Sequence, residues 1–204
     1  MSRPWRIHEV ASGFRLEDVW ELPTPGGPAD FPRLVEMITS GHPTQGGPRA
    51  VRVLNAIRLK LGDWLGWDAA ASGLGSRVPT LRDRLPADLR ERPGPELQAL
   101  PFTSLYLLED EFAAEVANRT MHGVLHLGWV ADDADAYRGQ MAVLVAPNGL
   151  FGRAYMAAIR PFRYRVVYPA LLRQWERAWR RRSRDTALAS TAAEDPEPTL
   201  TDGA

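Results

Sequence analysis

Two histidines four residues apart, His122 and His126, are the side chains in this sequence best suited to acid–base chemistry. On a helix, this spacing would bring both rings to one metal ion. The surrounding Thr120, Val124 and Val130 favour a strand instead. Four strand residues span roughly 13 Å, so the rings share a face but cannot share a metal. We expect them either to serve a pocket as acid–base or hydrogen-bonding groups, or to be structural residues of a sheet.

A short acidic run, Glu109, Asp110 and Glu111, precedes a further carboxylate at Glu115. Paired carboxylates can act as general acid and base. An acidic cluster at a hairpin is more commonly solvated, and we expect that here.

Two similar Pro/Gly segments occupy residues 23–28 and 43–48, each before a predicted helix. Glycine loops at helix starts can bind phosphate through backbone N–H groups. Here no Lys-Ser or Lys-Thr follows, and the prolines remove N–H donors. We interpret both segments as turns and expect no nucleotide, metal or other cofactor.

Candidate ligand contacts come from arginines and aromatic residues. Arg160 lies at a predicted helix kink and could bind an anionic group, because arginine holds carboxylates in a fork. Arg119 precedes the histidine segment and could assist it. The aromatic residues could line an apolar cavity or fill a core, and Tyr106 and Tyr155 are preferred because a buried hydroxyl needs a partner. This set comprises Tyr106, Trp129, Tyr137, Tyr155, Phe162 and Tyr168.

The end of the chain's last predicted helix is rich in arginine, with Arg173, Arg177, Arg180, Arg181, Arg182 and Arg184. Basic residues suit a helix C-terminus through the macrodipole. Contact with nucleic acid or a membrane surface is the alternative. The chain has 25 basic and 25 acidic residues, so we expect no nucleic-acid partner.

Composition narrows the class of protein further. The 204 residues contain no cysteine, which excludes disulfides, thiol nucleophiles and thiolate metal sites. No apolar run approaches the roughly 20 residues of a membrane helix, and the first residues do not resemble a signal peptide. We therefore expect a cytoplasmic protein without membrane insertion, and the oligomeric state stays open.

The elements that must position these residues are strands and helices in separate blocks. Period-two patterns predict strands at 14–22, 103–108, 112–117, 120–130 and 137–146. In the first, Phe14, Leu16, Trp20 and Leu22 should share one face, with Asp18 breaking the pattern. Helical patterns follow Asp30 and cover 50–65, and a long loop at 68–101 holds a short helix at 81–92.

A long helix should follow residue 150, kinked by Pro161 and Pro169. The last residues are small, acidic and proline-bearing, which indicates disorder. We predict one α+β domain over residues 1–184, in which a curved antiparallel sheet grips the C-terminal helix, followed by a disordered acidic tail over 185–204.

Several segments resemble one bacterial family. They are LRDRLP at 81–86, NRTMH at 118–122, LGWV at 127–130, QMAV at 140–143, NGLFGRAYM at 148–156, IRPFR at 159–163 and VYPALL at 167–172. The sequence is similar over residues 14–180 to the domain of unknown function 2867. This resemblance implies the helix-grip fold of the SRPBCC superfamily, which includes START lipid-transfer domains and the birch-pollen allergen. Members of that superfamily bind apolar ligands, and some are cyclases. Helix-grip sheets usually have seven strands, whereas five are predicted here.

Three functions therefore stay open. The first is binding of a small apolar or amphipathic ligand between the sheet and the C-terminal helix, through Tyr106, Arg119, Trp129, Tyr155, Arg160 and Phe162. The second is a cofactor-free cyclase, isomerase or lyase with His122 or His126 as the catalytic acid or base. The third is a protein-interaction module that uses the arginine-rich helix end.

Overall fold

A computed structural model describes residues 5–40, 74, 78–98, 100–117, 121–132 and 136–194 of the chain. Five strands, β1 (Arg15–Glu21), β2 (Thr103–Leu107), β3 (Glu111–Ala117), β4 (Met121–Ala131) and β5 (Tyr137–Pro147), form an open antiparallel sheet. Helix α2 (Phe31–Thr39) follows β1, and two short helices, η2 (Leu81–Arg84) and α4 (Ala87–Arg90), precede β2. The predicted α+β class and the five strands are confirmed.

The strand order is β1-β5-β4-β3-β2. Three hairpins build the meander from β2 to β5, and β1 adds to its free edge beside β5. The pairing of β1 with β5 shifts between Leu16 and Asp18, which is a bulge at Glu17. This shift corrects the predicted face of the strand, because Leu16 is 49% exposed. Phe14 instead contacts His122 on the other side of the sheet.

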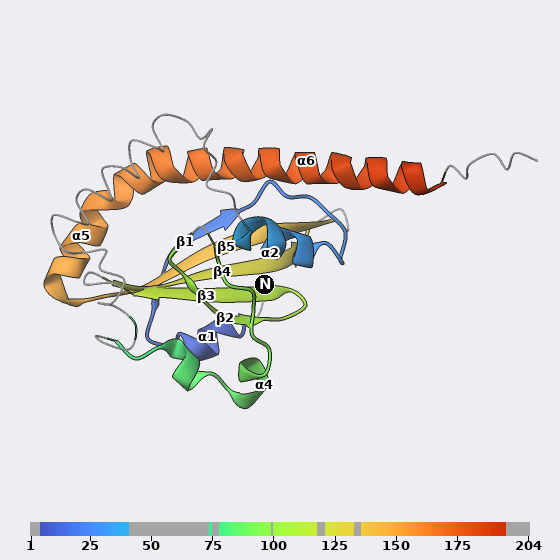
Figure 1. Ribbon diagram of the computed structural model, residues 1–204. Coiled ribbons are helices and arrows are strands. Elements are labelled where there is room, and N and C mark those ends of the chain that lie inside the picture. Colours follow the sequence, from blue (N-terminus) through green and yellow to red (C-terminus); the bar gives the residue numbers. More distant parts are fainter. Residues whose placement is uncertain are drawn as a thin grey trace, which may run out of the picture.

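One face of the sheet packs against α2 and the C-terminal helix α6 (Tyr168–Glu194), which runs along one edge of the described molecule (Figure 1). Aromatic residues fill this interface, with Phe31 and Trp179 each about 6.2 Å from Trp129 between ring centroids. Indole N–H groups also tie the layers, because Trp179 donates to the Pro25 carbonyl and Trp129 to the Gly27 carbonyl. The space between sheet and helix is thus occupied by core side chains at these positions.

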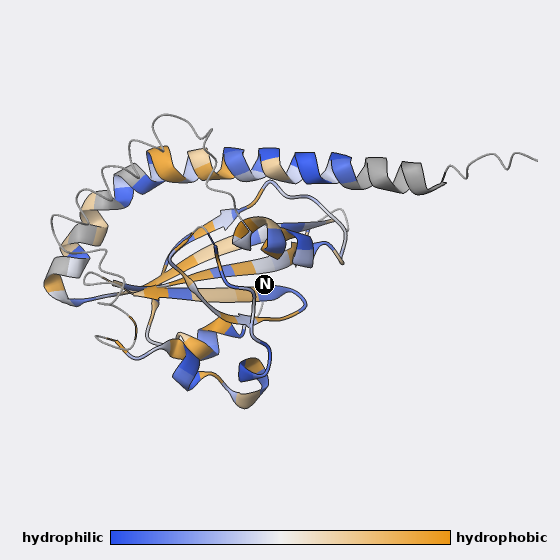
Figure 2. Cartoon of the chain, in the orientation of Figure 1, coloured by the Kyte–Doolittle hydropathy of each residue, from blue (hydrophilic) through white to orange (hydrophobic). Residues whose placement is uncertain are grey.

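The opposite face is covered by the N-terminal helix α1 (Ile7–Val10) together with η2 and α4 (Figure 1). Their buried side chains, Ile7, Val10, Leu81, Leu85 and Leu89, form a second core with β2 to β5. This cover makes the sheet the middle of three layers. Strand β4 is accordingly buried on both sides along most of its length. Its ribbon is a mixture of orange, pale and blue in Figure 2, because buried polar side chains lie among the apolar ones.

The C-terminal helical segment is divided into three parts, as its prolines predict. Helix α5 (Gly149–Phe162) leads into a π-helical turn, η3 (Arg163–Val167), and then into α6. Pro169 has no N–H to donate to the Arg165 carbonyl, so the regular ladder is interrupted there. Helix α6 ends at Glu194, and the predicted boundary at residue 184 stays a prediction.

The remaining expectations have mixed outcomes. Helix α2 and the short helices near residues 81–90 match their predictions. The helix predicted over 50–65 lies outside the described residues. No helix in the described ranges is both long and apolar enough to span a lipid bilayer.

Candidate functional site

Each predicted catalytic histidine is hydrogen-bonded to a glutamate of the neighbouring strand. His126 Nε2 lies 3.1 Å from Glu111 Oε1, and His122 Nε2 lies 2.7 Å from Glu115 Oε2. In the β3–β4 ladder the histidines stand opposite Ala113 and Ala117. These small neighbours let both imidazoles lean toward the carboxylates, which are two residues away along β3. A Glu–His pair thus occurs twice along the β3–β4 hairpin.

The carboxylates of both pairs also hold the segments that cover this face. Glu111 accepts hydrogen bonds from the backbone N–H of Arg6 and of Ile7, each at 2.9 Å, where α1 begins. Glu115 accepts from the Leu81 N–H at 3.0 Å and from the Thr80 hydroxyl, where η2 begins. Each glutamate therefore satisfies N–H groups that a short helix leaves unpaired at its start.

Burial and hydrogen bonding act in opposite directions on these carboxyl groups. Burial raises the pKa of Glu111, but hydrogen bonds from His126 and Tyr106 outweigh it and leave the pKa below its ordinary value. For Glu115 the outweighing hydrogen bonds come from His122, Thr80 and Leu81, and its pKa is also lowered. Both carboxylates are ionised near neutral pH, so the Nε2 atom of each histidine carries the proton it donates.

The two histidines are almost wholly inside the protein, with exposed fractions of 6% for His122 and 1% for His126. The Phe14 ring packs against His122 and the Trp5 ring against His126, both in T-shaped pairs. Tyr106, also buried, donates to Glu111 at 2.6 Å, and burial raises the pKa of its hydroxyl. The arrangement is a closed polar network within an apolar layer, which anchors the cover to the sheet.

A third buried carboxylate, Asp18, lies on the α6 face of β1. It accepts hydrogen bonds from Arg163, Tyr164 and Tyr168, three residues of the π-helical turn and the start of α6. Arg163 also donates to the Tyr168 hydroxyl at 2.7 Å. The residue that interrupts the strand pattern thus fixes the point where the C-terminal helix bends. Buried charges persist where they are paired in this way.

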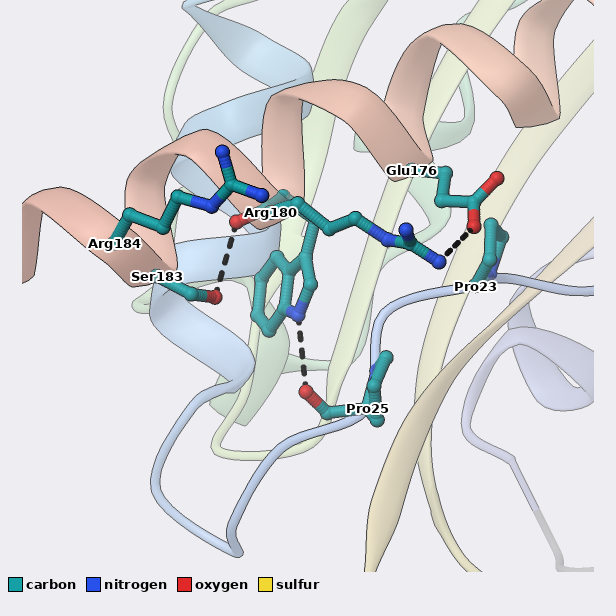
Figure 3. Close-up of a pocket in the computed structure, with 7 residues that line it drawn as sticks. Pro23, Pro25, Glu176, Arg180, Ser183 and Arg184 are labelled. Carbon is teal, nitrogen blue, oxygen red and sulfur yellow. Dashed lines mark hydrogen bonds and ion pairs between the residues drawn. The ribbon is translucent and has the colours of Figure 1, made fainter.

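Two adjoining hollows lie where α6 crosses the end of β1 and the connection to α2. The first, of about 340 Å³, is lined by Pro23, Pro25, Glu176, Trp179, Arg180, Ser183 and Arg184 (Figure 3). The second, of about 450 Å³, is lined by Glu21, Leu22, Pro23, Arg138, Leu172, Arg173 and Glu176. They share Pro23 and Glu176, so we call them together the α6 groove. Their volumes fall within the usual range for small-molecule sites.

The walls of the α6 groove combine an apolar floor with a charged rim. Trp179 lines the first hollow, and its indole N–H donates a hydrogen bond to the Pro25 carbonyl at 2.9 Å. On the rim, Arg180 pairs with Glu176 at 2.6 Å. Arg138 pairs with Glu21 and Asp132, while its Nε is buried without a partner in the described structure. Such a site suits an apolar body that ends in an anionic group.

The structure separates the predicted site residues into different places. Tyr106, His122 and His126 lie on the cover face, whereas Trp129 is buried on the α6 face. Arg160 is exposed, with its guanidinium 5.8 Å from the Tyr164 ring centre. Arg119 and the side chains of Tyr155 and Phe162 lie outside the described residues. A sheet therefore stands between the histidines and the helix that was expected to enclose a ligand with them.

Two glutamates of these sites are buried, although the sequence predicted them to be exposed. The carboxylates of the Glu–His pairs, Glu111 and Glu115, were expected to be solvated, yet their exposed fractions are 2% and 0%. They occupy the same face of β3 as Ala113, at period two, whereas Glu109 lies in the turn before the strand and is exposed. Nothing in the sequence pairs Asp18 with Arg163 or Tyr168, about 150 positions later.

Comparison with known proteins adds a family. A family model described as protein of unknown function (DUF2867) matches residues 10–170. The chain belongs to this family. No curated protein and no solved structure is detectably similar to it. The DUF2867 match spans the whole sheet and the π-helical turn, so the Glu–His pairs and the Asp18 cluster fall within it. Most of α1 precedes the match, and the α6 part of the groove extends beyond it.

Proposed function

We propose that this DUF2867 protein binds a small amphipathic anion in the α6 groove. The observation that carries the proposal is the composition of the groove wall, in which an indole, two leucines and two prolines lie beside four arginines. Apolar contact gives affinity through the area removed from water. Arginine at the rim fixes the end of the ligand that stays hydrated.

The proposed ligand site lies at the margin of the interface between the sheet and α6, whereas the sequence predicted a site inside that interface. The interior between sheet and α6 holds Trp129, Trp175 and Tyr168, all nearly inaccessible to solvent. The groove lies at the margin of the same interface, where Leu22 and Trp179 of this core reach the surface hollows. A ligand there contacts the sheet edge and the C-terminal helix together, as the helix-grip resemblance implies.

Ligand binding is tested by titrating the full chain calorimetrically with decanoate and, as a neutral match, with decanol. We expect decanoate to bind more tightly because only it carries the anion. Arg184→Gln should weaken decanoate about fivefold, since the lost charge is solvent-exposed at the rim. Arg177→Gln removes the same charge from the same helix but not from the groove, so it should leave binding unchanged. Equal affinity for decanol, or equal effects of the two substitutions, would contradict the proposal.

The enzyme alternative stays an untested prediction. A substrate could reach His122 or His126 only if the cover of α1, η2 and α4 opened, because both rings are buried beneath it. Identification of a molecule that copurifies with the protein, by native mass spectrometry and solvent extraction, would name a ligand class for either function.

A further inference from the structure

A row of exposed arginines follows the outer side of α6. Its members are Arg173, Arg177, Arg180, Arg181 and Arg184. At 100° per residue, these positions fall within about 100° of arc, opposite the buried Trp175 and Trp179. The row therefore lies along one straight edge of the described molecule, where α6 is mostly hydrophilic in Figure 2.

The net charge of the protein is zero, but positive and negative residues are concentrated in different parts of the chain. Residues 149–184 contain ten arginines and one carboxylate, Glu176, a net charge of +9. The chain sums to zero, so its other residues carry −9. Within the row only Arg180 forms an ion pair with a described residue, namely with Glu176. A net charge near zero therefore conceals a basic edge, and it is the local field that attracts a partner.

The row is unfavourable for the isolated fold. Arg173 and Arg177, Arg177 and Arg181, and Arg180 and Arg184 are like charges four residues apart on a helix. Such pairs repel and destabilise the helix by a few tenths of a kcal/mol each. A partner with closely spaced negative charges would remove this repulsion.

We propose that the arginine row docks the protein electrostatically on an anionic lipid surface, without insertion. A straight outermost helix can lie along a flat charged surface over its whole length (Figure 1). The apolar side of α6 is turned inward onto the sheet, so the contact is made by guanidinium groups alone. Basic residues next to an anionic leaflet are attracted within about a Debye length.

The position of the α6 groove favours a lipid surface over nucleic acid. Arg180 and Arg184 belong both to the row and to the groove wall. In this respect the inference rests on the proposed function, since amphipathic anions concentrate at lipid surfaces. The remainder of the chain, at −9, would repel a polyanion that curved around the molecule.

The test is cosedimentation of the full chain with phosphatidylcholine vesicles, with and without phosphatidylglycerol, at low and high salt. We expect binding only to the anionic vesicles, and loss of binding at high salt. Arg177→Gln with Arg181→Gln should weaken it about 30-fold, from roughly fivefold for each arginine. The matched control, Arg84→Gln with Arg92→Gln, removes two exposed arginines from the opposite side and should change nothing.

Neither Arg177 nor Arg181 lines the groove, so the row variant should still bind decanoate, which separates this inference from the proposed function. Unchanged circular dichroism would show that the variant is folded. Equal binding to neutral vesicles, or equal loss in both double variants, would overturn the proposal. Binding to duplex DNA with none to anionic vesicles would overturn it as well, and would assign the row to nucleic acid.

Discussion

At the scale of single residues, the carboxylates of Glu111 and Glu115 determine how the cover is attached. Each takes one hydrogen bond from a histidine and others from the first N–H groups of a short helix. Each carboxylate thus accepts hydrogen bonds both from the sheet and from the cover. These bonds explain why a charged group is stable in an apolar layer. In this structure the histidines therefore hold the two glutamate side chains in place.

Replacement of Glu115 by Gln should lower the free energy of unfolding by about 2 kcal/mol, because the neutral amide weakens several charge-assisted hydrogen bonds at once. Urea denaturation measures this change. Glu109→Gln makes the same chemical change at an exposed position in the preceding turn and should stay within about 0.5 kcal/mol of the unmodified protein. Equal effects of the two substitutions would show that the pair does not stabilise the cover.

Acid should loosen the protein through the same two groups. Their pKa values in the folded protein lie below the value of 4.5 for the free side chain. A lowered pKa gives stability that is complete above the unfolded pKa and is lost as the pH falls through the folded pKa. Stability measured by thermal unfolding should thus decline below about pH 4.5. Glu111→Gln with Glu115→Gln should flatten that decline, and an unchanged slope would assign it to other carboxylates.

At the scale of elements, close approach between β5 and α2 depends on Gly139. A Cβ atom there would lie 2.6 Å from Leu34 and 3.0 Å from Leu22. Gly139→Ala should therefore destabilise the protein by about 1–3 kcal/mol through overpacking. Gly13→Ala is the matched control, since a Cβ there meets nothing within 4 Å. The difference in urea midpoint between the two variants is the measurement, and equal midpoints would show that α2 can shift to make room.

The elements were largely predictable, whereas their pairing across the fold was not. Alternating apolar residues located all five strands, and Pro161 and Pro169 located the bend of the C-terminal helix. The bulge at Glu17 was missed because register depends on the partner strand, and β5 lies far along the chain. The same reason hid the burial of Glu111, since a covering segment 100 residues away supplies its partners.

At the scale of the whole molecule, the sheet is stable because both of its faces are covered. Deletion of residues 1–13 would remove Ile7 and Val10 from the second core and leave Glu111 without the two backbone N–H donors of Arg6 and Ile7. We expect a loss of several kcal/mol of stability, from about 1.5–3 kcal/mol for each large buried side chain. Urea unfolding and binding of a hydrophobic dye to the uncovered face would measure it. Ile7→Ala should show a part of the loss, and a deletion without effect would mean that the cover contributes nothing.

Strand β1 lies at the edge of the sheet and pairs with a strand that is distant in the sequence. Arg15 pairs with Val145 and Glu21 with Gln140, so more than a hundred residues separate the partners. Strands β2 to β5 form hairpins between neighbours in the chain, which close short loops quickly. During synthesis on the ribosome β1 emerges first but stays without its partner until β5 has followed. Folding is therefore expected to begin in the meander and to finish with β1. A circular permutant that begins after β1 places β1 behind the C-terminal helix and shortens its separation from β5 along the chain, so the slow phase should become faster.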